Sequence, residues 1–97
     1  MNYQQKIVLT RKSILDFLSI LCNPLSSKSD FEKQKQITYN HLLNFLEKHL
    51  PNQPRLANLM KMINELTPYS SFSDHCYVIE MLNAIQETLD EYILKNQ

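Results

Sequence analysis

The chain has 97 residues, no glycine, and ten basic and ten acidic side chains, so its formal net charge at pH 7 is zero. A chain of this length forms one domain with little core to spare for a ligand cavity, and without glycine it lacks the phosphate-cradling loops and dinucleotide fingerprints that depend on a missing Cβ. The neutral charge also argues against a dedicated nucleic-acid binder, which needs a clustered positive surface.

Residues 3–22 form the first predicted helix, with Asn2 as its candidate N-cap. Its apolar stripe recurs at helical spacing and contains Tyr3, Ile7, Ile14, Leu18 and Leu21, with Leu15 and Cys22 beside it. Polar residues interrupt the middle of this stripe. An alternative therefore stays open, in which Thr10 caps a shorter helix and residues 1–9 are a loose arm. Pro24 follows the predicted helix end.

The second predicted helix, residues 30–50, has the most continuous helical period in the chain. Ser29 and Glu32 have the spacing of a capping box at its start, and Pro51 ends it because the residue before proline disfavours helical geometry. Its inward stripe contains Phe31, Lys35, Thr38, Leu42, Phe45, Leu46 and His49. We expect the other helices to dock along this one.

The third predicted helix, residues 54–66, follows a stiff corner that holds two prolines. Pro54 suits the first helical position, where its missing N–H is no loss. The apolar set is clean and consists of Leu56, Leu59, Met60, Ile63 and Leu66. The short link before this helix predicts that it packs antiparallel to the second one.

The fourth predicted helix covers residues 74–95. Ser73 is its predicted cap, and Phe72 is expected to pack on Tyr77 as a hydrophobic staple. The buried stripe is predicted to contain Val78, Met81, Leu82, Ile85, Leu89, Tyr92 and Ile93. Four amphipathic helices with short links predict an all-α protein, a single domain over residues 1–97 that forms an antiparallel up-down-up-down four-helix bundle.

No residue spacing in the chain predicts catalysis, a metal or a cofactor. His41 and His49 are eight apart and cannot share a metal as an i, i+4 pair would. His75 and Cys76 are adjacent, so on a helix their side chains diverge. Cys22 and Cys76 have no zinc-like spacing, and we expect both to be reduced thiols, buried near helix ends. The protein is therefore not expected to be an enzyme, nor to take a small-molecule substrate.

The charge is unevenly divided along the chain. Residues 1–48 carry seven basic against four acidic side chains, whereas residues 49–97 carry three against six. Solvated helix faces explain this difference, and so would an acidic C-terminal half that meets a cationic partner. The basic residues Lys6, Arg11 and Lys12 suggest a second function class, a small regulatory adaptor that binds a signalling or transcription protein. The N-terminus is not typical of a signal peptide, which predicts a cytoplasmic protein.

The layout of residues 14–94 resembles the immunity proteins of pediocin-like (class IIa) bacteriocins, the enterocin A immunity family. The resemblance is carried by a long second helix with LLNFLEKHL, the corner PNQPRL, a shorter third helix LANLMKMINEL, the loop PYSSFSD and a long last helix. Members of that family are cytosolic antiparallel four-helix bundles of about this length.

This resemblance implies a non-enzymatic guard protein without a cofactor. It implies binding to the membrane receptor of the bacteriocin, the mannose phosphotransferase permease, once the bacteriocin has engaged it, from a cytoplasmic position that includes the inner face of the membrane. In the family the C-terminal half governs which bacteriocin is resisted. The partner-binding residues expected here are therefore Tyr69, Phe72, Tyr92 and Lys95. From the residues alone, the exposed aromatic material is also explained by core and staple packing.

Overall fold

The computed structural model describes residues 3–23, 25–49 and 54–95, and these contain four α-helices and no strand. The helices are α1 (Tyr3–Leu21), α2 (Lys28–His49), α3 (Pro54–Glu65) and α4 (Phe72–Lys95). The prediction of an all-α helical bundle is confirmed, and the predicted helix bounds differ from the observed ones by two residues or fewer. Among the described helices, none combines the length and the apolar content that crossing a bilayer demands.

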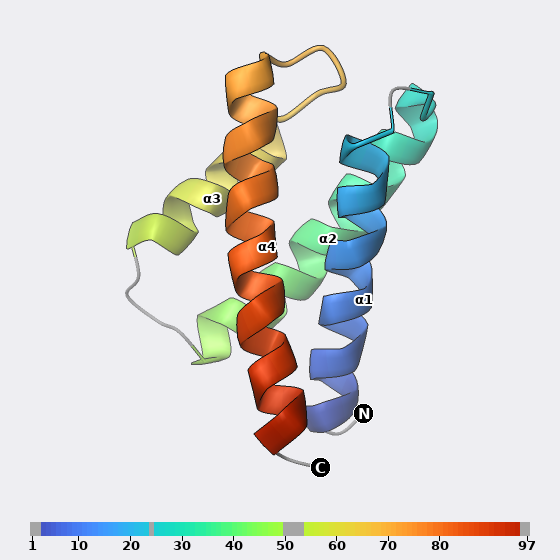
Figure 1. The fold of residues 1–97 in the computed structure, drawn as a ribbon. Coiled ribbons are helices and arrows are strands. Elements are labelled where there is room, and N and C mark those ends of the chain that lie inside the picture. Colours follow the sequence, from blue (N-terminus) through green and yellow to red (C-terminus); the bar gives the residue numbers. More distant parts are fainter. Residues whose placement is uncertain (1–2, 24, 50–53, 96–97) are drawn as a thin grey trace.

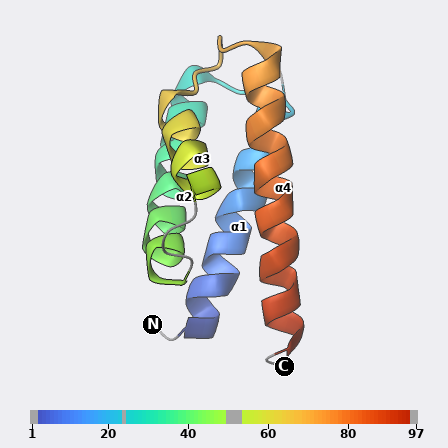
Figure 2. The ribbon, with the colours of Figure 1, turned by 90° about the vertical axis from the view of Figure 1, so that its left-hand side faces the viewer.

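The helices pack as a closed ring of neighbours. Within the described residues α1 contacts α2 and α4, and α3 also contacts α2 and α4, so α1 and α3 lie diagonally opposite each other. Successive helices run in opposite general directions, and α2 crosses obliquely behind α4 (Figure 1). The connections from α1 to α2 and from α3 to α4 consequently lie at the same end of the molecule (Figures 1 and 2).

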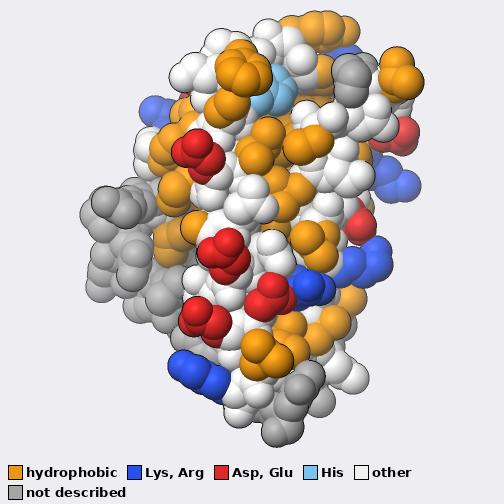
Figure 3. Space-filling view, in the orientation of Figure 1, with side chains coloured by type: hydrophobic (Ala, Val, Ile, Leu, Met, Phe, Trp, Pro, Cys, Tyr) orange, Lys and Arg blue, Asp and Glu red, His pale blue; other side chains and the backbone are white. Residues whose placement is uncertain are grey.

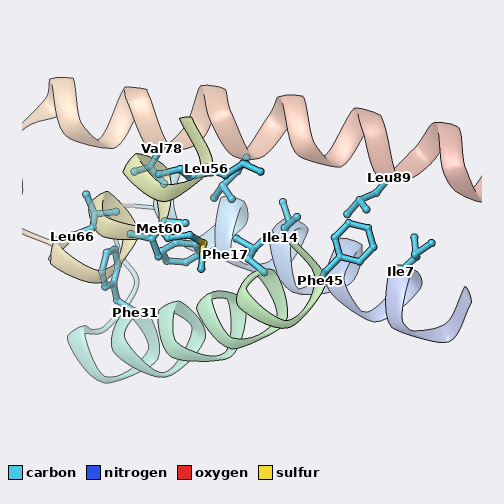
Figure 4. Close-up of a cluster of buried hydrophobic side chains, with 14 residues drawn as sticks. Ile7, Ile14, Phe17, Phe31, Phe45, Leu56, Met60, Leu66, Val78 and Leu89 are labelled. Carbon is cyan, nitrogen blue, oxygen red and sulfur yellow. The ribbon is translucent and has the colours of Figure 1, made fainter. Parts of the chain in front are cut away.

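The core runs along the inside of this ring and draws on all four helices (Figure 4). Phe17 on α1 meets Phe31 on α2 edge to face, with ring centroids 5.7 Å apart. The apolar stripe predicted for α3 is confirmed at every position. The buried hydrophobic residues are Ile7, Ile14, Phe17, Phe31, Leu42, Phe45, Leu56, Leu59, Met60, Ile63, Leu66, Val78, Leu82 and Leu89.

The buried face of α1 is rotated from the predicted one. Phe17 is fully buried although the predicted stripe omitted it, whereas Leu15 and Cys22, which were placed beside that stripe, are exposed. The face runs through Ile7, Thr10, Ile14 and Phe17, in steps of three and four residues. The predicted stripe residues Leu18 and Leu21 are half-buried, and the side chain of Tyr3 lies outside the described part of the chain.

Thr10 lies inside α1 and caps nothing, so the alternative of a shorter first helix is wrong for the described residues. Its hydroxyl is buried and donates to the carbonyl oxygen of Lys6, 2.8 Å away, one turn earlier. A threonine whose hydroxyl donates to the carbonyl oxygen four residues earlier satisfies its polar group within the helix. It can therefore occupy a core position without leaving an unpaired hydroxyl.

The contact between α1 and α2 contains a polar patch. The carbonyl oxygen of Ser13 accepts a hydrogen bond from the hydroxyl of Thr38 at 3.0 Å and another from the side-chain amide of Gln34 at 3.3 Å. Both Ser13 and Thr38 are buried. Serine is small, which allows the α2 side chains to reach the backbone of α1, and the buried hydroxyl of Thr38 finds an acceptor there.

Lys35 occupies a buried position on the inward stripe of α2, as predicted. Its side chain caps the C-terminal end of α3. Its ammonium group donates to the carbonyl oxygens of Asn64 at 3.2 Å and Leu66 at 3.0 Å, and it lies 3.1 Å from a carboxylate oxygen of Glu32. The last carbonyl groups of a helix have no partner within the helix and carry partial negative charge. In a chain without glycine, the usual C-capping residue, a lysine from the neighbouring helix satisfies them.

Both predicted serine caps are wrong, because each cap lies two residues earlier. Ser27 caps α2 through a hydrogen bond from the Asp30 amide to its hydroxyl at 3.0 Å, and Ser71 caps α4 through the Asp74 amide at 3.1 Å. The side chain of Phe72 is 84 % exposed, so the predicted staple does not form. Three serines lie near the start of each of these helices, at residues 26, 27 and 29 and at residues 70, 71 and 73, and their spacing alone does not show which one caps.

The cap of α4 predicts that Ser71 and Ser73 contribute differently to the free energy of unfolding. Replacing Ser71 with alanine removes the acceptor for the Asp74 amide, and we expect the free energy of unfolding to fall by about 1 kcal/mol. The matched control is Ser73→Ala, which we expect to change it by less than about 0.5 kcal/mol. Urea denaturation followed by circular dichroism measures both. A larger loss for Ser73→Ala would contradict the observed cap.

Candidate partner-binding surface

The connection between α3 and α4 is a turn whose shape is fixed by its own side chains. The amide of Thr67 donates to the hydroxyl of Ser70 at 2.9 Å, and the amide of Tyr69 donates to the hydroxyl of Thr67 at 3.1 Å. A backbone hydrogen bond from Ser70 to Thr67, 3.1 Å long, closes the turn. Such side-chain-to-backbone bonds favour a tight turn over continued helix. The turn consequently holds the tyrosine at its apex.

The turn and the first residue of α4 present large apolar side chains to solvent. Tyr69 is 82 % exposed and Phe72 is 84 % exposed. Leu25, in the connection between α1 and α2 at the same end of the molecule, is 90 % exposed. We call these three residues the apolar tip. Sequence reasoning missed Leu25, and the only signal for it was a leucine in a serine-rich link with no helical stripe to join.

Among the residues expected to bind a partner, Tyr69 and Phe72 lie far from Lys95. Tyr69 and Phe72 lie together at the start of α4. Lys95 is exposed at the last turn of the same helix, which places it about 35 Å away at 1.5 Å of rise per residue. Tyr92 belongs to α4 near that far end, but its side chain lies outside the described part of the structure. Tyr69 and Phe72 can therefore contact one small patch of a partner, and Lys95 cannot join them there.

The basic residues near the N-terminus are largely engaged in ion pairs. The guanidinium group of Arg11 bonds to the carboxylate of Asp90 on α4, and Lys12 pairs with Asp16 one turn later at 2.8 Å. Lys6 is exposed on the same helix. With two of its three cations already paired, this segment offers a weaker positive surface than the sequence suggested.

The structure describes the side chains of two histidines, His41 and His75. His75 is half-buried, its Nδ1 lies 3.0 Å from the carbonyl oxygen of Ser71, and its ring lies against Phe31 with centroids 6.5 Å apart. His41 is half-buried on α2, and the side chain of His49 lies outside the described residues. In the described ranges, no three histidine, cysteine or acidic side chains gather in a way that could hold a metal ion.

Both cysteines are free thiols. Cys22 is exposed at the end of α1, not buried as expected, and Cys76 is half-buried in the first turns of α4. Comparison with protein-family models, with curated proteins and with solved structures gave no significant match. The function of the chain therefore has to be inferred from its own residues and surface.

Proposed function

We propose that this protein is a bacteriocin immunity protein, which acts inside the cell by contact with the bacteriocin-engaged membrane receptor and without catalysis. The layout supports the proposal, because a long α2, a shorter α3, an aromatic and serine loop and a long α4 follow in the order of the pediocin-like immunity proteins. The receptor this implies is the mannose phosphotransferase permease, bound from the cytoplasmic side of the membrane.

The observation that carries the proposal is the exposure of Tyr69, on a turn that is fixed by hydrogen bonds, and of Phe72, at the first residue of α4. Aromatic side chains are the commonest anchors of protein–protein interfaces. A turn held in one shape loses little conformational entropy on binding, so more of the contact energy appears as affinity. A standard interface buries about 800 Å² on each partner, which means that surfaces beside the apolar tip must contribute as well.

An immunity assay tests this proposal directly. We expect a sensitive strain that expresses the protein to survive at least one member of a panel of pediocin-like bacteriocins. We expect the Tyr69→Ser/Phe72→Ser variant to lose most of that protection, because losing a hot spot of about 2 kcal/mol weakens binding about 30-fold. The readout is the lowest bacteriocin concentration that stops growth.

The control for this assay is Ile37→Ser, which alters an exposed apolar side chain on α2, a helix that carries no residue of the apolar tip. It should protect as well as the unmodified chain, and immunoblots should show equal protein levels. If the bacteriocins of the whole panel kill cells that express the unmodified chain as readily as cells that lack it, the proposed function is overturned. Full protection by the double variant would overturn the role of the apolar tip.

A further inference from the structure

The outer side of the α1–α4 contact carries exposed apolar residues in register. Arg11 bonds to Asp90, which fixes where the two helices face each other. Val8 precedes Arg11 by three residues and Leu15 follows it by four, so all three lie on one stripe of α1. Leu94 follows Asp90 by four residues on α4. Because neighbouring helices here run in opposite directions, Val8 and Leu94 lie on the same side of the ion pair.

These three side chains are only partly covered. The exposed fractions of Val8, Leu15 and Leu94 are 48 %, 36 % and 68 %. Figure 3 shows hydrophobic side chains above and below a place where a basic group touches an acidic group, beside further acidic groups on α4. We call the surface formed by Val8, Leu15 and Leu94 with the Arg11–Asp90 pair the seam face. It is distinct from the apolar tip.

A row of carboxylates borders the seam face on α4. Glu80, Glu87 and Glu91 are seven and four residues apart, so they share one stripe of the helix, and all three are exposed. Among the described residues none of the three forms an ion pair, whereas Asp90 and Asp16 are both paired. An apolar strip with an unneutralised acidic border is complementary to a partner that is apolar in its centre and basic along one edge.

The unpaired carboxylates beside the seam face favour one kind of binding partner over others. A second copy in a symmetric contact would bring the same unpaired carboxylates, and its Arg11 and Lys12 are already paired. An anionic membrane surface would be repelled by the acidic row. An amphipathic helix with lysine or arginine on its polar face meets both requirements, since such helices bind grooves through apolar anchors spaced by helical turns.

We propose that the seam face binds a cationic amphipathic helix of a partner protein or peptide, with its apolar face on Val8, Leu15 and Leu94 and its basic residues toward Glu80, Glu87 and Glu91. The carboxylate row spans about 16 Å at 1.5 Å per residue, which a helix of about 18 residues covers with room at both ends. This inference does not depend on the proposed function, because it concerns other residues and holds for a partner of any origin.

Binding of designed peptides to the purified full chain tests the inference. The probe is an 18-residue amphipathic helix with leucine and alanine on one face and lysine on the other, and the matched control peptide has glutamate in place of each lysine. We expect the lysine peptide to bind and the glutamate peptide not to bind. We expect Glu80→Gln/Glu87→Gln/Glu91→Gln to weaken binding about tenfold, from three rim charge pairs of a few tenths of a kcal/mol each.

Single variants and a binding map make the result specific. Glu87→Gln should weaken binding, whereas Glu65→Gln, which removes an exposed carboxylate on α3, should leave it unchanged. NMR chemical shifts should move for Val8, Leu15 and Leu94. The inference is overturned if the lysine peptide does not bind, if both peptides bind equally, or if the shifts map to the apolar tip. A dimer that Leu15→Ser and Leu94→Ser dissolve would assign the seam face to self-association instead.

Discussion

Replacing Phe17 with alanine is expected to lower the free energy of unfolding by about 3–5 kcal/mol. The side chain is fully buried and packs edge to face on Phe31 at the contact between α1 and α2. The loss combines the transfer of the missing ring from core to water with the cavity that remains. Domains of this size are stable by only about 5–15 kcal/mol, so this single change removes a large share of the stability.

The matched control is the same substitution at Phe72, whose ring is 84 % exposed. We expect Phe72→Ala to change the free energy of unfolding by less than about 0.5 kcal/mol. Urea denaturation of the two variants beside the unmodified chain measures the difference. If Phe17→Ala does not fold, Phe17→Leu gives a smaller loss that can still be measured. Equal losses at the two positions would contradict the observed burial.

Replacing Lys35 with alanine is expected to lower the free energy of unfolding by about 2–3 kcal/mol. The substitution removes the donor for the carbonyl oxygens of Asn64 and Leu66 and the partner of Glu32. It also deletes the aliphatic stem that packs between α2 and α3. Hydrogen exchange should become faster in the last turn of α3, because that turn loses its cap.

Two further variants separate the causes of this loss. Lys35→Met keeps the apolar stem and removes both the charge and its desolvation, so we expect it to cost less than Lys35→Ala. Lys33→Ala changes an exposed lysine on the same helix and should stay within about 0.5 kcal/mol of the unmodified chain. If Lys35→Met were as unstable as Lys35→Ala, the amine and not the stem would provide the stability.

The fold class and the four helices could be predicted from the sequence because each helix has a long apolar period that ends at or near a proline or a polar link. The prediction was most accurate for α3, where Leu59, Met60 and Ile63 form a stripe with no polar interruption. Lys35 and Thr38 were placed on the inward stripe of α2 by their spacing alone. The structure gives the reason they tolerate burial, which is hydrogen bonding to neighbouring helices.

The errors have separate physical causes. Thr10 was interpreted as an interruption because it is polar, yet its hydroxyl is satisfied one turn earlier, and this shifted the predicted stripe away from Phe17. The caps were misplaced because several serines precede both α2 and α4, and a local pattern cannot decide which one lies at the helix boundary. Capping by the neighbouring helix, as Lys35 caps α3, leaves no local signal at all.

The candidate site was only partly predictable. Tyr69 and Phe72 were identified as aromatic residues in a loop, and both are exposed. The fourth helix was predicted over residues 74–95, so its length already placed Lys95 at the far end, and the observed α4 of 24 residues agrees with that. Leu25 joins the apolar tip because successive helices run in opposite directions, which brings the α1–α2 and α3–α4 connections to the same end of the molecule.

The hydrogen bonds of Thr38 and Gln34 to the backbone of Ser13 determine how far along its axis α1 sits against α2. Aliphatic side chains can replace one another in packing. If α1 slid by one turn along α2, about 5.4 Å, much of the apolar contact between these helices could form again. After such a slide the buried hydroxyl of Thr38 would have no hydrogen-bond acceptor, which costs about 1–3 kcal/mol. The hydrogen bonds of a few polar atoms thus select one alignment of α1 and α2 among several that apolar packing alone would allow.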